Sequence, residues 1–217
     1  MEAVLGLRAV ELLCSRLCHD LVGPVGAVNN GVELMEEMAD QGSNLIEAGD
    51  ALDLIADSAA SAARRLALFR LVLGAAGAQG GLRPADARAA LDGWFHGGRI
   101  SLDWAAPPSM PASTKPGLLK LALLAALVVE EGMPRGGVLR LSPTPDEGGL
   151  TITGTGQGAA FRAEALPALA GTLDDTALEP RSVLAHLLPR MAAFYGFSLS
   201  TRQAGGEIAL LIEPVSG

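Results

Sequence analysis

Aromatic residues, cysteine and clustered basic residues are all scarce in this sequence. Only 4% of the 217 residues are aromatic while 49% are hydrophobic, a composition that favours helices packed through aliphatic side chains. The net charge is -8 and no run of Lys or Arg occurs, which argues against a nucleic-acid partner. No stretch reaches the roughly 18 uncharged apolar residues that a membrane span requires. The first residues include Glu11 and Arg16 and are unlike a signal peptide.

The two cysteines, Cys14 and Cys18, lie four residues apart. Within one helix this spacing does not indicate a disulfide framework. The string from Cys14 to His19 also has one residue too many for a haem attachment site. We therefore expect a cytoplasmic protein with no membrane contact and no metal or haem site.

Two long helical patterns occupy the first third of the chain. From Glu2 to Met38, and again from Ala48 to Leu73, apolar residues recur at alternating three- and four-residue steps, which predicts two helices with continuous apolar seams. A turn is predicted over residues 39–44, where Asn44 and Glu47 fit a capping box. The two helices should form an antiparallel hairpin, and one hairpin alone cannot bury both seams. We therefore expect a homodimer in which two hairpins form a four-helix bundle. The seam positions are Val10, Cys14, Leu17, Leu21, Pro24/Val25, Val28, Val32 and Met35, followed by Ala48, Leu52, Ile55, Ala59, Ala62, Leu66, Phe69 and Leu73.

A Gly/Ala-rich segment over residues 74–81 predicts a domain boundary, which divides the chain into domains 1–77 and 78–217. The second domain mixes helical and strand patterns. This order predicts an α/β sandwich with helices on one face of a mixed sheet, and an α+β class for the whole chain. Helices are expected over 84–95, 117–131 and 181–195, and strands over 99–104, 138–142, 150–153, 197–202 and 207–213.

His19 is the residue with the most distinctive surroundings. It precedes Asp20 and lies five residues before Pro24, inside the first helical pattern. At about 100° per residue it lies about 200° from Leu17 and Leu21, so it should point away from the seam towards solvent. An imidazole with an ordinary pKa of about 6.5 is mostly neutral near pH 7 and is a competent nucleophile.

The neighbours of His19 on its helix face are small or polar. Two of them are glycines, which cost roughly 1 kcal/mol each inside a helix, and we hypothesise that they let a partner domain approach the imidazole closely. The candidate partner-binding or phosphate-neighbouring residues are Ser15, Arg16, Gly23, Gly26 and Asn30.

Three further residues could act directly on His19 or its helix. Asp20 could hold the tautomer of the imidazole or exchange a proton with it. Arg16 could offset the charge of a bound phosphoryl group, or only extend its aliphatic stem over the bundle. Pro24 lacks an N–H, so the helix should bend there.

The string from His19 to Ala27 resembles the phosphoacceptor box of the ChpT-type histidine phosphotransferases. This resemblance implies that His19, with Asp20 as the second catalytic residue, takes a phosphoryl group from the receiver domain of a hybrid histidine kinase. It further implies delivery of that group to the receiver domains of response regulators. Mg²⁺ would then be held by the receiver domain, and this chain would bind no cofactor.

The order of elements after Gly81 resembles the Bergerat-type ATP-binding domain of histidine kinases, but the nucleotide contacts of that domain are missing. Residues 118–128 contain no asparagine to hold Mg²⁺. Residues 154–158 keep the glycines of an Asp-x-Gly-x-Gly motif without its aspartate, and no glycine-rich lid occurs near residues 178–182. The resemblance therefore implies a degenerate domain that does not use ATP and adds docking surface for a receiver.

Two alternatives remain open on the sequence alone. One is an ATP-using histidine kinase with an unusual nucleotide site. The other is a non-enzymatic dimeric scaffold that binds response regulators without accepting phosphate. The two other histidines are weaker acceptor candidates, since His96 should end a helix beside two glycines and His186 lies among leucines and should be partly buried.

Overall fold

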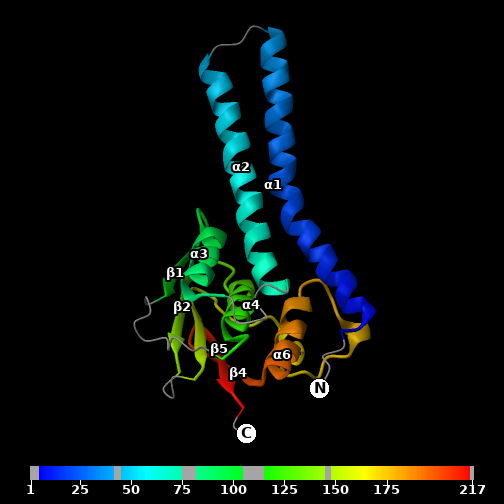
Figure 1. Cartoon of the computed structure of the whole chain (residues 1–217), viewed down its shortest axis with the longest axis vertical. Coiled ribbons are helices and arrows are strands. Elements are labelled where there is room, and N and C mark those ends of the chain that lie inside the picture. Colours follow the sequence, from blue (N-terminus) through cyan, green and yellow to red (C-terminus); the bar gives the residue numbers. More distant parts are fainter. Residues whose placement is uncertain (1–4, 42–44, 75–81, 105–114, 145–147, 216–217) are drawn as a thin grey trace.

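The computed structural model describes residues 5–41, 45–74, 82–104, 115–144 and 148–215. Two long helices form an arm, and the rest of the chain forms a sheet covered by helices (Figure 1). The elements in chain order are α1 (Leu7–Gln41), α2 (Leu45–Leu73), α3 (Pro84–Phe95), β1 (Ile100–Trp104), α4 (Leu118–Glu131), β2 (Gly137–Pro143), β3 (Leu150–Thr155), α5 (Ala165–Leu169), the 3₁₀ helix η2 (Asp175–Ala177), α6 (Val183–Tyr195), β4 (Phe197–Ala204) and β5 (Glu207–Pro214).

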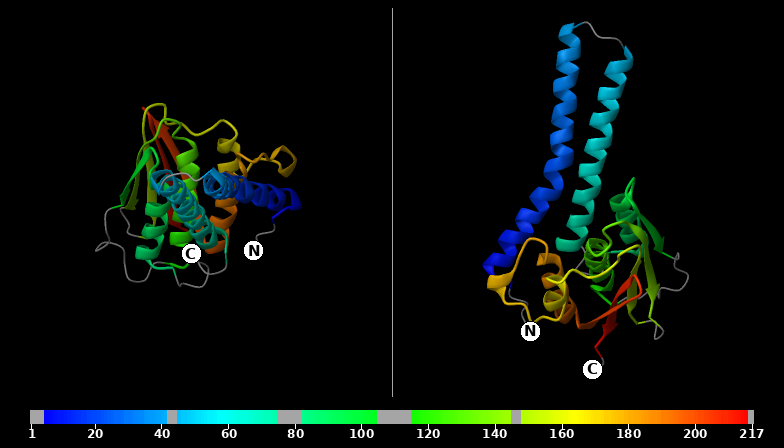
Figure 2. Two further views of the ribbon diagram at one scale, coloured as in Figure 1. Left: turned by 90° about the horizontal axis from the view of Figure 1, so that it is seen from above. Right: turned by 180° about the vertical axis from the view of Figure 1, so that it is seen from behind.

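Helices α1 and α2 form the predicted antiparallel hairpin, which projects from the sheet-containing part (Figure 2). Pro24 lies inside α1, and Figure 1 shows that the helix changes direction along its length, as expected for an internal proline. The turn predicted from Ala39 is wrong for its first three residues, because α1 continues to Gln41. Alanine and glutamine are good helix formers, which explains the extension. The expected capping residue Asn44 lies outside the described residues.

Only part of the apolar seam on α2 is covered within the chain. Phe69 is buried and Ile55 is half-buried, whereas Leu52 and Leu66 remain 55% and 52% exposed. On α1 the same division holds, since Leu21 and other seam residues are half-buried while several seam residues face solvent. The exposed seam residues of the hairpin are Val10, Cys14, Val25, Val32, Leu52, Ala59 and Leu66. One hairpin therefore leaves these apolar seam residues, which we call the exposed stripe, uncovered.

The five strands form one mixed sheet in the order β1-β2-β3-β5-β4. β1 and β2 are parallel, and the remaining neighbours are antiparallel. Helix α4 contacts β2, β3 and β5, while α3 contacts β1 and α6 contacts β4, so the prediction of helices on one face of a mixed sheet is confirmed. The β4–β5 turn is made by Gly205 and Gly206, which both have positive φ, the conformation that the tightest hairpins require.

Helix α4 is the centre of the core. All of its residues from Leu118 to Val129 are buried, so this helix is apolar on every side because it is covered on every side. Its only charged residue in that stretch, Lys120, extends to the end of the hairpin and donates a hydrogen bond to the carbonyl of Gly74 at 2.7 Å. This contact satisfies a carbonyl at the C-terminal end of α2.

The hairpin is fixed to the sheet-containing part by both of its helices. α2 packs against α3 and α4, while α1 contacts α6 and η2. Phe69 of α2 meets Trp94 of α3 edge to face, with ring centroids 5.4 Å apart, and Arg65 lies over the same indole at 4.9 Å. The base of the hairpin and the sheet-containing part therefore share one core cluster.

The short elements α5 and η2 were not predicted. The boundary segment 75–81 lies outside the described residues, so the division into domains 1–77 and 78–217 stays a prediction. Within the described ranges, no helix is both long and apolar enough to cross a membrane.

Candidate functional site

The imidazole of His19 is 84% exposed on α1, in agreement with the predicted direction of this side chain. Its Nδ1 lies 3.2 Å from Oδ1 of Asp20. A carboxylate oxygen accepts hydrogen bonds, so we assign the hydrogen of the neutral ring to Nδ1. The lone pair of the neutral ring is then on Nε2, and the exposed ring can use it as a nucleophile.

The carboxylate of Asp20 is shared between two side chains. Its Oδ2 accepts a hydrogen bond from Nε of Arg16 at 3.0 Å while Oδ1 faces His19. The side chain of Asp20 is only 11% exposed, so these contacts hold it in place. Asp20 is thus oriented by Arg16 on one side and orients His19 on the other.

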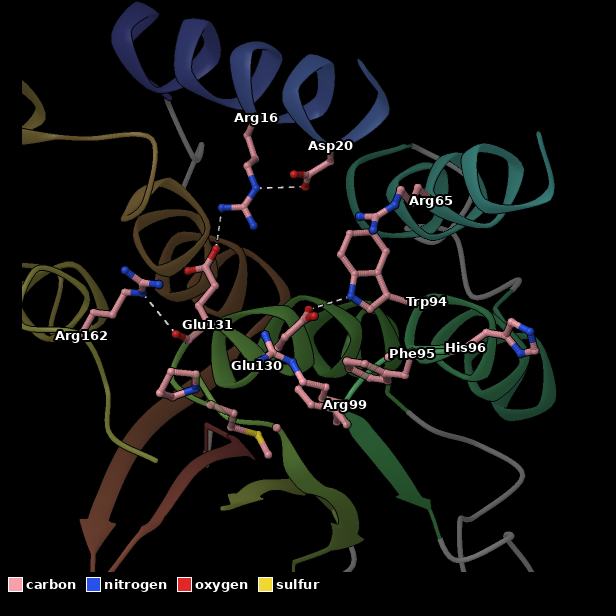
Figure 3. A pocket seen from close by; sticks show the side chains of 16 residues that line it. Arg16, Asp20, Arg65, Trp94, Phe95, His96, Arg99, Glu130, Glu131 and Arg162 are labelled. Atoms are coloured by element: carbon pink, nitrogen blue, oxygen red, sulfur yellow. Dashed lines mark hydrogen bonds and ion pairs between the residues drawn. The ribbon is translucent and has the colours of Figure 1, made fainter. Parts of the chain in front are cut away.

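Arg16 also joins the hairpin to the sheet-containing part. Its Nη1 donates a hydrogen bond to Oε1 of Glu131, the last residue of α4, at 2.6 Å (Figure 3). Burial opposes the charge of Arg16, but Glu131 and Asp20 outweigh burial and raise the pKa of Arg16. Burial raises the pKa of Glu131, and the charge of Arg16 acts in the opposite direction. The guanidinium is therefore the cation between two carboxylates of distant segments.

A cleft of about 400 Å³ lies beside His19, and we call it the His19 cleft. Its walls come from α1, from the end of α4 and from the segment before α6. Arg162 donates from Nε to the backbone carbonyl of Glu131 at 3.1 Å, and Arg181 is exposed. Three arginines and two carboxylates line the cleft, which leaves a small excess of positive charge that suits an anionic group. The lining residues are Ser15, Arg16, His19, Asp20, Glu131, Arg162, Pro180 and Arg181.

A second pocket of about 690 Å³ lies between the hairpin and the ends of α3 and α4 (Figure 3). Here Trp94 donates from Nε1 to Oε2 of Glu130 at 2.6 Å. Burial raises the pKa of Glu130 to about 7, against the lowering effect of the hydrogen bond from Trp94. This carboxyl lies beside Glu131 in the chain but belongs to the packing between α3 and α4.

The predicted site residues fall into two groups. Ser15, Arg16, His19 and Asp20 come together in the His19 cleft. Gly23, Gly26 and Asn30 lie farther along α1, are exposed and do not line that cleft. A Cβ added to either glycine would meet nothing within 4 Å, so the surface along this part of α1 is open.

Sequence reasoning missed Glu131, Arg162 and Arg181, which lie more than a hundred residues from His19 along the chain. Ion pairs between distant segments leave no periodic pattern. The only available signal was the pair Glu130–Glu131, two acids at the end of an otherwise apolar helix. The sequence suggested that Arg16 either offsets the charge of a phosphoryl group or extends over the bundle. Neither alternative included its hydrogen bond to Glu131 on α4.

The remaining histidines differ from His19 in their contacts. His96 is exposed at the C-terminal end of α3, as predicted. His186 is buried in α6, with Nδ1 at 3.1 Å from Nη1 of Arg190 and Nε2 at 3.2 Å from Oδ1 of Asp175. Burial, followed by the charge of Arg190, lowers the pKa of His186. A buried imidazole held in this way cannot meet a partner domain.

The glycines at residues 154–158 have structural reasons to be there. A Cβ on Gly154 would lie 2.6 Å from Cγ1 of Val129 and 2.7 Å from the sulfur of Met133. A Cβ on Gly156 would clash with the backbone carbonyl oxygen of Gly136, and Gly158 has a φ of 74°. These glycines are therefore required by packing and backbone conformation, and their presence does not indicate a nucleotide site. Among the described residues, no group of three or more His, Cys, Asp or Glu side chains is arranged as metal ligands.

The chain is similar to known proteins in both sequence and structure. A family model described as the histidine phosphotransferase C-terminal domain matches residues 84–207. The chain is 31% identical over 206 residues, covering 93% of each chain, to the protein phosphotransferase ChpT of Brucella abortus (strain 2308). It is also similar to a solved structure described as a bacterial phosphotransferase, with a TM-score of 0.73, 29% identity, and coverage of 97% of this chain and 98% of that one.

The pKa of Glu130 leads to a prediction about stability. Between a pH of about 4.5, the ordinary pKa, and about 7 the folded chain keeps a proton that the unfolded chain has released. Stability should therefore fall as the pH rises through this window. Glu130→Gln removes the titration but keeps the acceptor for Trp94. The variant should be more stable than the wild type at pH 8, by about 3 kcal/mol at most, with no such advantage at pH 4.5.

Urea unfolding at fixed chain concentration measures this difference. Glu207→Gln, at an exposed position on β5, leaves Glu130 in place and should follow the wild type at every pH. Identical pH profiles for the wild type and Glu130→Gln would contradict the assignment.

Proposed function

The chain belongs to the ChpT-type histidine phosphotransferase family and is a phosphotransferase, and we propose that His19 carries the phosphoryl group in its reaction. In this proposal the group comes from the receiver domain of a hybrid histidine kinase and goes to the receiver domains of response regulators. The observation that carries the proposal is the exposed imidazole of His19 with its Nδ1 paired to Asp20. A cytoplasmic location of the protein stays a prediction from the sequence.

The proposed transfer is a displacement at phosphorus. The lone pair of Nε2 attacks the phosphorus of an aspartyl phosphate, the N–P bond forms, and the P–O bond to the receiver's aspartate breaks. The electron pair leaves with that carboxylate. Phosphorylation at Nε2 places positive charge on the ring, and the carboxylate of Asp20 beside Nδ1–H offsets that charge. Delivery to the next receiver is the same step in reverse, and no proton needs to leave the ring in either direction.

The His19 cleft supplies positive charge beside this step. Arg162 and Arg181 face the same cleft as the imidazole. Guanidinium groups suit the oxygens of a phosphoryl group, and they also suit the acidic pocket of a receiver domain. In this proposal Mg²⁺ stays with the receiver, and this chain contributes side chains alone.

We further propose that two chains form a homodimer through their hairpins. The support is the exposed stripe of apolar seam residues on each hairpin, which includes Leu52 and Leu66. A second copy of the same stripe would cover these residues in a four-helix bundle. His19 lies on another side of α1 and would remain accessible.

The alternative of an ATP-using kinase has less support. Residues 118–129 of α4 are buried on all sides, so this stretch of the helix offers no exposed oxygen ligand for Mg²⁺ bound to a nucleotide. We therefore propose that the chain takes phosphate from a receiver and not from ATP. The alternative of a non-enzymatic scaffold does not account for the orientation of His19 by Asp20.

The first test is replacement of the acceptor. His19→Ala should abolish labelling when the chain is mixed with a phosphorylated receiver. Among the described residues, no other exposed imidazole is paired with a carboxylate. His96→Ala removes a histidine that is also exposed and should leave labelling unchanged. The label should be acid-labile and base-stable, as expected for a phosphoramidate.

Incubation with radiolabelled ATP provides the control for the kinase alternative and should give no label. Labelling of the His19→Ala variant, or labelling of the wild type from ATP, would contradict the proposal.

The open surface along α1 gives a second prediction. Gly26→Leu places a bulky side chain beside the predicted path of a receiver and should slow transfer by about tenfold or more, because close approach is needed for in-line attack. Gly49→Leu is the matched control. Gly49 has equally open surroundings but lies near the start of α2. Stopped-flow or quench assays measure the rates, and equal rates for the two variants would show that the surface at Gly26 does not contact the receiver.

The dimer is tested at the exposed stripe. Leu52→Glu combined with Leu66→Glu should raise the dissociation constant of the dimer by at least about 100-fold, because two charges from each chain would be buried on assembly. Leu166→Glu, on the exposed surface of α5 at 42% exposure, is the control and should not change it. Sedimentation equilibrium measures the constant, and a monomeric wild type would contradict the proposed dimer.

A further inference from the structure

Three polar contacts connect the sheet-containing part to the acceptor histidine. Oε1 of Glu131 accepts from Nη1 of Arg16 at 2.6 Å, and Nε of Arg16 donates to Oδ2 of Asp20 at 3.0 Å. Oδ1 of Asp20 then lies 3.2 Å from Nδ1 of His19. Figure 3 shows the first two contacts, with Arg16 between the two carboxylates. The series begins in a buried helix and ends at an exposed ring.

We propose that Glu131 is a positioning residue for phosphotransfer, acting on His19 through Arg16 and Asp20. The inference rests on the proposed role of His19 as the phosphate carrier. It assigns to the sheet-containing part a task beyond docking, because one of its side chains sets the tautomer of the acceptor.

The reason lies in the geometry of the guanidinium. Arginine binds a carboxylate most favourably with two parallel N–H bonds to both oxygens. On α1 alone, Arg16 and Asp20 are an i, i+4 pair and could adopt that arrangement. It would occupy both oxygens of Asp20 and weaken the hydrogen bond to His19.

A bidentate pair of this kind uses Nε together with Nη2, as Arg83 does with Asp86. Glu131 opposes it by holding Nη1, which orients the guanidinium so that Nη2 makes no hydrogen bond to Asp20. With Nη1 directed at Glu131, Arg16 reaches Asp20 through Nε alone. Oδ1 of Asp20 is then left for the N–H at Nδ1 of His19. Nε2 keeps its lone pair, which is the form of the ring that attacks phosphorus.

Glu131 is well placed for this task because its own position is fixed. It ends α4, whose preceding residues 118–129 are buried. Its backbone carbonyl accepts from Arg162 at 3.1 Å, and its neighbour Glu130 is held by Trp94 at 2.6 Å. A charge-assisted hydrogen bond to a carboxylate that is held in this way can restrain the long side chain of Arg16. An exposed surface pair, worth about 0.5 kcal/mol, would not restrain it.

The test compares Glu131→Gln with Glu164→Gln in the full-length chain. Glutamine keeps the shape of the side chain at residue 131 but loses its charge, so Arg16 should turn to Asp20. Glu164 approaches Arg162 at 4.0 Å and does not touch Arg16, so its replacement is the matched control. Thermal unfolding of both variants establishes that they fold.

The first readout is the tautomer of His19, measured by ¹⁵N NMR of histidine-labelled protein and assigned with His19→Ala. Glu131→Gln should increase the population with hydrogen on Nε2, whereas Glu164→Gln should match the wild type. The second readout is the rate of transfer from a phosphorylated receiver. It should fall by about tenfold in Glu131→Gln and stay unchanged in Glu164→Gln.

A double-mutant cycle separates positioning from simple packing. In an Arg16→Ala background, Glu131→Gln should cause no further loss of rate, because its effect passes through Arg16. An unchanged tautomer and an unchanged rate in Glu131→Gln would overturn the inference, as would additive losses in the cycle. If the wild type accepts no phosphate, the proposed function fails, and the tautomer measurement still decides whether Glu131 orients His19.

Discussion

The guanidinium of Arg16 is the point on which the candidate site depends. It lies between a carboxylate four residues away on its own helix and a carboxylate 115 residues away on α4. A partly buried cation needs such partners, since burial alone would favour its neutral form. By satisfying Arg16, the two carboxylates fix the angle of Asp20, and through Asp20 they fix the ring that faces solvent. The position of His19 therefore depends on the contacts of the Arg16 side chain.

Local patterns in the sequence predicted the acceptor and most of the elements. The three- and four-residue steps of apolar residues place His19 on the side of α1 opposite Leu17 and Leu21, and its imidazole is exposed. A proline at the first position and glycines after the last turn predicted the bounds of α3. The end of α1 was predicted too early because Asp40 and Gly42 suggested a turn that the neighbouring helix formers overcome. Glu131, Arg162 and Arg181 could not be predicted, because an isolated charge in the sequence does not indicate which distant charge it will meet.

In the sheet-containing part, packing explains the glycines that resemble a nucleotide-binding motif. Gly154 faces Val129 and Met133 at distances that leave no room for a side chain, and Gly158 has a backbone conformation that favours glycine. Both constraints come from the core that α4 forms with the sheet. The glycines at residues 154–158 are therefore explained by the close fit of α4 and by backbone conformation, without a ligand.

The acceptor and its supporting carboxylate belong to the same chain. Every contact from Glu131 to His19 is made within one polypeptide, so an assembly of two chains would contain two independently completed centres. Each chain therefore carries its own support for His19, and a second chain is not needed to complete it.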